Sequence, residues 1–148
     1  MFIFVMIFYG LAYYFFESVF NMVADITGWY RVFKTDEKKK LRGWCSVYMF
    51  LLGFIFAIGL WGLYFIPYFK TGSIWVVVLY MIITGLHITI NELLFGYILN
   101  IKLKLNLWDY SREFLNFRGQ ISLIRAIGWV LLGMPIWFIN FTLYNLLF

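Results

Sequence analysis

The sequence predicts an all-α, polytopic membrane protein with four transmembrane helices. Of its 148 residues, 64% are hydrophobic and only 13% are charged, whereas soluble domains carry about 25% charged residues. Four apolar stretches are each long enough to cross a bilayer core, which needs about 20 helical residues. We therefore expect residues 1–148 to form one transmembrane domain in a multi-pass membrane protein.

The four expected spans follow one another with short connections. The first covers residues 2–27, and the second covers residues 44–66, where Pro67 stops the helix. The third covers residues 74–100, after the turn PYFKTGS, and the fourth covers residues 121–148. The first span begins without a basic segment and is too long for a signal sequence, so we expect the protein to retain it.

Basic residues are concentrated in two expected loops, residues 28–43 and 101–120. The first loop holds six and the second holds four, whereas the turn between spans two and three has Lys70 alone. This asymmetry predicts that both loops are cytoplasmic and both termini outside, an N-out/C-out topology. Charges beside membrane spans indicate anionic lipid, not nucleic acid, as the partner. The expected docking residues for lipid or a partner protein are Lys38, Lys39, Lys40 and Arg42.

Glu17, Glu92 and Arg125 lie inside the apolar spans, where a charged residue costs about 2.5–3.5 kcal/mol and normally faces a partner or a wet cavity. Helical spacing places Glu17, Asn21 and Asp25 on one face of their span. The estimated depths of Glu17, Glu92 and Arg125 in the bilayer would allow Arg125 to bridge the two glutamates as a buried ionic cluster. The expected intramembrane polar site consists of Glu17, Asn21, His87, Asn91, Glu92 and Arg125.

Two interpretations of this polar site stay open. It could relay protons or ions, or anchor a polar substrate or lipid headgroup. It could instead lock the helices in register, because buried ion pairs often specify geometry without adding stability.

For His87, an interhelical hydrogen bond is a better expectation than a metal site. No motif for nucleotide hydrolysis or metalloprotease chemistry occurs, and Cys45 is the only cysteine. We therefore expect no enzyme, no cofactor and no metal.

Residues 91–133 read NELLFGYILNIKLKLNLWDYSREFLNFRGQISLIRAIGWVLLG. This stretch resembles the bacterial membrane family described as ABC-transporter type IV, or CmpB-like permeases. Members show a glutamate, then WDYS, then an asparagine and a glycine, followed by small and aromatic residues in the next span. Glu17 and the Arg42-Gly43 pair resemble features of the family's first two spans. Within residues 91–133, the residues that match the glutamate, the WDYS motif, the asparagine and glycine, and the following span are Glu92, Trp108, Asp109, Tyr110, Ser111, Asn116, Gly119, Gly128, Trp129 and Gly133.

The resemblance implies a permease-like subunit of a transport complex in the bacterial cytoplasmic (inner) membrane. Expected partners are membrane lipids, further copies of the chain or other membrane subunits, and a separate ATPase that docks on the basic loops. The competing interpretation is a non-transporting scaffold or a lipid-binding or assembly factor, and a pore is a third.

The WDYS motif also has a physical interpretation. Trp108 and Tyr110 suit headgroup depth, and Asp109 and Ser111 suit the cap of a helical turn. Alternatively, Asp109 pairs with a loop arginine or docks a cytoplasmic partner.

Overall fold

The computed structural model describes residues 2–28, 47–64 and 66–147. Its long elements are all helices, α1 (Phe2–Thr27), α2 (Val47–Tyr64), α3 (Ile74–Phe95) and α4 (Leu123–Leu147). All four are long and apolar enough to cross a membrane, which confirms the expected all-α fold with four membrane-spanning helices. Residues 29–46 lie outside the described part of the chain, and with them Lys38, Lys39, Lys40, Arg42 and Cys45.

Three short elements connect the long helices. A 3₁₀ turn, η2 (Pro67–Lys70), joins α2 to α3. The third helix continues as a π-helical segment, η3 (Gly96–Lys102). Two antiparallel strands, β1 (Asn116–Phe117) and β2 (Ile121–Ser122), form a small hairpin that leads directly into α4. The second expected loop therefore contains ordered structure where it enters the fourth span.

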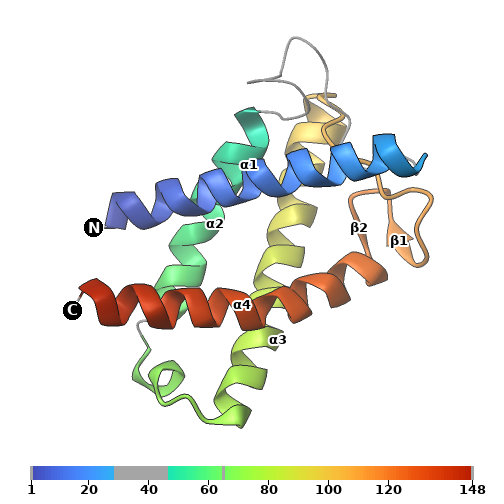
Figure 1. Ribbon diagram of the computed structural model, residues 1–148. Helices are drawn as coiled ribbons and strands as arrows, with labels where there is room; N and C mark the ends of the chain where they lie inside the picture. The colour runs from blue at the N-terminus through green and yellow to red at the C-terminus, as the bar shows by residue number, and fades with distance from the viewer. Residues whose placement is uncertain (1, 29–46, 65, 148) are drawn as a thin grey trace.

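The helices form two crossing layers. Helices α1 and α4 run in opposite directions, and α2 and α3 cross them (Figure 1). The rings of Tyr13 and Trp129 stack at 6.1 Å between α1 and α4. Gly53 permits the crossing of α1 and α2, because a Cβ there would lie 2.7 Å from the Tyr9 carbonyl oxygen. A larger residue at this position would force the two helices apart.

Asn140 forms a polar hub that touches all four helices. Its side chain is fully buried, and its carbonyl oxygen accepts a hydrogen bond of 2.7 Å from the Tyr9 hydroxyl. Its amide nitrogen donates to the Tyr80 hydroxyl at 2.9 Å and to the Leu60 carbonyl at 3.4 Å. Because lipid offers no hydrogen-bond partners, these contacts satisfy polar groups that would otherwise be costly in the bilayer.

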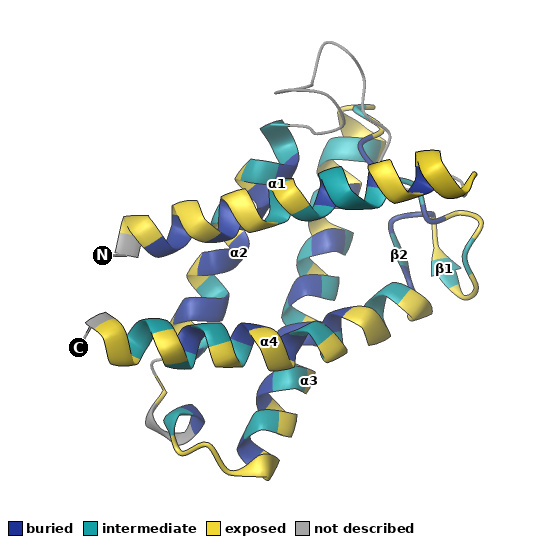
Figure 2. Ribbon diagram, in the orientation of Figure 1, coloured by how far each residue is buried: buried dark blue, intermediate teal, exposed yellow. Residues whose placement is uncertain are grey.

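The outward faces of the helices are apolar. Exposed residues follow the outer sides of α1 and α4 (Figure 2), and they include Phe15 and Leu131, which are 68% and 63% exposed. A protein that is solvated by lipid is expected to expose many large apolar side chains in this way. The polar groups discussed below lie inside this apolar shell.

Candidate functional site

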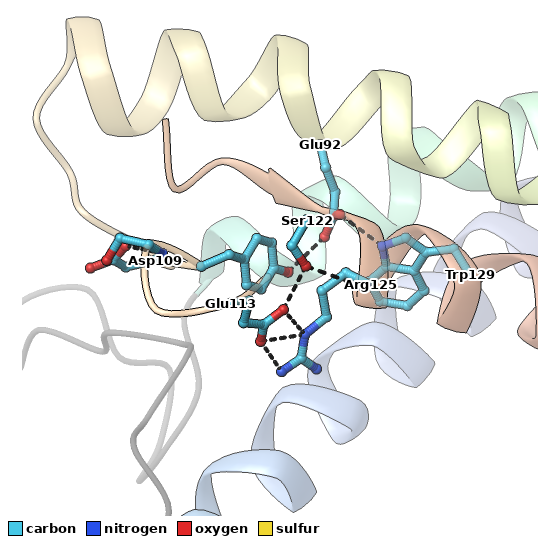
Figure 3. Close-up of polar contacts among 8 residues, drawn as sticks. Glu92, Asp109, Glu113, Ser122, Arg125 and Trp129 are labelled. Carbon is cyan, nitrogen blue, oxygen red and sulfur yellow. Dashed lines mark hydrogen bonds and ion pairs between the residues drawn. The ribbon is translucent and has the colours of Figure 1, made fainter. Parts of the chain in front are cut away.

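Glu92 is a buried carboxylate held by two donors from different parts of the chain. It lies near the end of α3 and is 5% exposed. Its Oε1 accepts a hydrogen bond of 3.0 Å from the Tyr110 hydroxyl, and its Oε2 accepts one of 2.7 Å from the Trp129 indole nitrogen. In Figure 3 the Trp129 ring points toward this carboxylate. The carboxylate thus joins α3, α4 and the segment that connects them.

Trp108 and Tyr110, which we expected at headgroup depth, have their rings buried inside the protein. They are only 2% and 0% exposed. The Trp108 indole donates to the Gln120 carbonyl at 3.0 Å, and the Tyr110 amide donates to the Gly119 carbonyl at 2.8 Å. These bonds fold residues 107–110 against the hairpin, which buries both rings.

Tyr110 is a reliable donor to Glu92. Burial, followed by the nearby Glu92 charge, raises the pKa of the Tyr110 hydroxyl well above its usual range. The hydroxyl therefore keeps its proton at neutral pH and can donate it to the carboxylate.

The remaining motif residues build the turn that carries Tyr110. The Asp109 carboxylate accepts a hydrogen bond of 2.9 Å from the Ser111 amide, which is an Asx-type turn and not the helix cap we expected. The Asn116 amide donates to the Ser111 carbonyl at 3.1 Å, and its side-chain oxygen accepts from the Gly119 amide at 3.1 Å. Asp109 lies apart from the Glu92 carboxylate in Figure 3, and its bond to Ser111 helps to shape the turn.

Gly119 is required at its position for two reasons. Its φ is +69°, a left-handed conformation that glycine adopts without steric cost. A Cβ would also lie 2.8 Å from the Asp109 Oδ1. The glycine of the N-x-x-G pattern thus allows the hairpin to approach the WDYS turn.

Arg125 forms an ion pair with Glu113. This corrects our expectation that Arg125 would bridge Glu17 and Glu92. Its Nη2 lies 2.6 Å from the Glu113 Oε1, and its Nε donates to the same oxygen at 2.9 Å. Figure 3 shows the guanidinium turned toward Glu113. The physical reason is proximity along the chain, because the segment that carries Glu113 leads directly into α4. The Ser122 hydroxyl completes the cluster by donating to Glu113 at 2.5 Å.

The two clusters are contiguous. The Arg125 guanidinium carbon lies 5.3 Å from the centre of the Tyr110 ring, and the hydroxyl of that ring binds Glu92. A cation above an aromatic face is stabilised by the negative charge of the ring's π-system. Glu92 and Arg125 therefore belong to one site, with Tyr110 between them.

The other expected polar residues occupy separate surroundings. Glu17 and Asn21 are both 1% exposed, as their shared helix face predicts, whereas Asp25, expected on the same face, is exposed near the end of α1. The Asn91 amide donates to the His87 carbonyl at 2.7 Å and lies 3.3 Å from the His87 Nδ1. This polar contact runs within α3, whereas the imidazole faces α2, where it packs against Gly59 and interacts with the Phe56 backbone, in agreement with the expected interhelical contact.

Sequence reasoning missed several residues of the site. Glu113 could have been found, because it and Asp109 are the only carboxylates in the basic segment 101–120, and an acid among bases often pairs locally. Asn100 gave no such signal. Its amide donates to the Gln120 side chain at 2.9 Å, and its oxygen accepts from the Leu107 amide at 2.6 Å. Asn100 thereby fastens the end of η3 to the connecting segment.

Comparison with known proteins gives no match to a family model, to a curated protein or to a solved structure. The arrangement of these residues is therefore the basis for the functional proposal.

Proposed function

We propose that this chain is a permease-like subunit of a transport complex in the bacterial cytoplasmic membrane, with Glu92 as its central polar link. One observation carries the proposal. Residues of the permease resemblance from four separate stretches, Glu92, Tyr110, Gly119 and Trp129, belong to one network of hydrogen bonds.

The geometry of the network suits a mechanical role. Tyr110 belongs to the segment 103–122, which lies between the two membrane helices α3 and α4. A partner that binds this segment and displaces it would pull on the carboxylate through Tyr110, and the carboxylate would pass the displacement to α4 through Trp129. Coupling of this kind needs packed, hydrogen-bonded elements between the two sites.

A second candidate is a non-transporting scaffold or lipid-binding factor. It is favoured by the pairing of the charges, since each Glu92 oxygen accepts a hydrogen bond from the protein and Arg125 holds Glu113. Such satisfied groups suit a lock that holds helices in one arrangement. Both candidate functions depend on the same contacts within the chain. They are therefore distinguished by which other proteins accompany the chain in the membrane.

The test is to purify the tagged protein from its native membrane in mild detergent and to identify every chain that accompanies it. The permease proposal expects a stoichiometric ATPase. This ATPase should be lost when Lys38, Lys39 and Lys40 are changed to Gln and retained in the control variant Lys70→Gln. A homo-oligomer that carries lipid but no ATPase would contradict the permease proposal and favour the scaffold.

A further inference from the structure

A groove of about 240 Å³ runs between α1 and α4. Its α1 wall is formed by the Phe16 and Phe20 rings, whose centres are 4.6 Å apart. Gly128 opens the α4 wall, because a Cβ at this position would meet nothing within 4 Å. The principal α4 residues that line the groove are Arg125, Gly128, Trp129 and Leu132.

The groove has a cation at one end and apolar side chains along its length. Arg125 lies in the first turn of α4, and its guanidinium carbon is 5.5 Å from the centre of the Phe20 ring. Its side chain is 22% exposed, whereas that of Glu113 is 8% exposed, so the Arg125 side chain is the more accessible of the two. Leu132 lies seven residues further along α4, about 10 Å deeper at 1.5 Å per residue.

The groove opens toward lipid. The α4 residues beside it are apolar and exposed, with Ile124 at 56%, Ile127 at 52% and Leu131 at 63%. Because α4 is long and apolar enough to span the membrane, the molecules next to this face are acyl chains. The cation at the end of the helix lies where a span leaves the hydrocarbon core, at the depth of lipid phosphates.

We propose that this groove binds one anionic phospholipid, with an acyl chain between Phe16 and Gly128 and the headgroup phosphate at Arg125. The apolar wall matches the chain and the guanidinium matches the phosphate. This site is separate from the Glu92 link, and the proposal does not depend on a transport role.

Glu113 sets the strength of this site. Its carboxylate holds the Arg125 guanidinium at 2.6 Å, so a lipid phosphate has to share the cation with it. Removing the Glu113 charge should therefore strengthen binding of an anionic lipid, although it breaks an ion pair of the protein. A merely structural role for the pair predicts no such gain.

The experiment is a lipid titration of the delipidated full-length protein in detergent, read by native mass spectrometry with phosphatidylglycerol and phosphatidylcholine as probes. Gly128→Leu fills the groove, and Gly62→Leu is the matched control, because a Cβ at Gly62 also meets nothing within 4 Å. Both changes raise helix propensity, so neither is expected to unfold its helix. Wild-type protein should prefer phosphatidylglycerol. Gly128→Leu should weaken its binding by about tenfold or more, and Gly62→Leu should leave it unchanged.

A second pair of variants tests the headgroup. Glu113→Gln should tighten phosphatidylglycerol binding severalfold. Adding Arg125→Gln to that variant should abolish the preference over phosphatidylcholine, because it removes the cation that binds the phosphate. Equal binding of the two lipids by wild-type protein would overturn the proposal. So would equal lipid affinity in Gly128→Leu and Gly62→Leu, or weaker phosphatidylglycerol binding in Glu113→Gln.

Discussion

The Trp129 indole of α4 donates a hydrogen bond of 2.7 Å to the Glu92 carboxylate of α3. The other oxygen of the same carboxylate accepts from Tyr110, at 3.0 Å. A buried carboxylate in an apolar helix is costly unless it is paired, and here its two partners come from different elements. The resulting link fixes the segment 103–122 to the membrane helices that precede and follow it.

Tyr110→Phe should destabilise the protein by about 1–3 kcal/mol, because it leaves one buried carboxylate oxygen without its donor. Tyr97→Phe is the matched control, since Tyr97 is 45% exposed and its loss should change stability by no more than about 0.5 kcal/mol. Thermal unfolding in detergent measures both. Equal melting temperatures for the two variants would argue against the hydrogen bond to Glu92.

Glu113 and Arg125 should be energetically coupled. In a double-mutant cycle with Glu113→Gln and Arg125→Gln, the coupling energy should be about 0.5–3 kcal/mol, as for residues in direct contact. The comparison cycle uses Glu17→Gln with Arg125→Gln, and its coupling energy should be smaller than that of Glu113 with Arg125. Unfolding free energies in detergent supply both values, and stronger coupling to Glu17 than to Glu113 would contradict the ion pair described above.

Gly119→Ala should loosen the turn that carries Tyr110. The alanine Cβ would collide with Asp109, in addition to the cost of a left-handed backbone. Gly28→Ala is the control, because Gly28 has the same φ of +69° and a Cβ there would meet nothing within 4 Å. Limited trypsin digestion should cut faster at Arg112 and Arg118 in Gly119→Ala than in Gly28→Ala. Identical digestion patterns would show that the close approach to Asp109 is unimportant.

The charge asymmetry predicts a topology that can be measured directly. Reporter tags at either terminus should be located outside, and a tag at Lys39 should be located inside. In a Cys45→Ser background, a single cysteine at Lys104 should react with an impermeant reagent only from the cytoplasmic side. A cysteine at Thr71 should react only from the outside, and the reverse pattern would refute the predicted orientation.

The membrane helices were predictable from sequence because hydrophobic length alone determines which segments can span a bilayer. The first expected span, residues 2–27, coincides with α1, and the fourth, residues 121–148, differs from α4 by two residues at its start and one at its end. Helical spacing also placed Glu17 and Asn21 together correctly, because it depends only on the period of the helix.

The connecting segment was less predictable, because its structure depends on contacts that no local pattern encodes. Trp108 suits a membrane interface by residue type, but its indole finds a partner in the Gln120 carbonyl and the ring becomes buried. For Arg125, the estimated depths favoured Glu17 and Glu92 as partners, whereas its partner Glu113 lies outside the expected spans. Asn140 was missed because its spacing of five residues to Asn145, the other asparagine of α4, does not place the two on one helix face.

The most direct test of the Glu92 link is hydrogen–deuterium exchange of the full-length protein in detergent, compared among wild type, Glu92→Gln and Glu92→Ala. The amides of residues 107–120 should exchange faster in Glu92→Ala, because Tyr110 and Trp129 both lose their acceptor. Glu92→Gln should keep more protection, since its amide oxygen can still accept from Trp129, and the amides around Asn140 should be unaffected in both variants. Wild-type protection of residues 107–120 in Glu92→Ala would contradict the link.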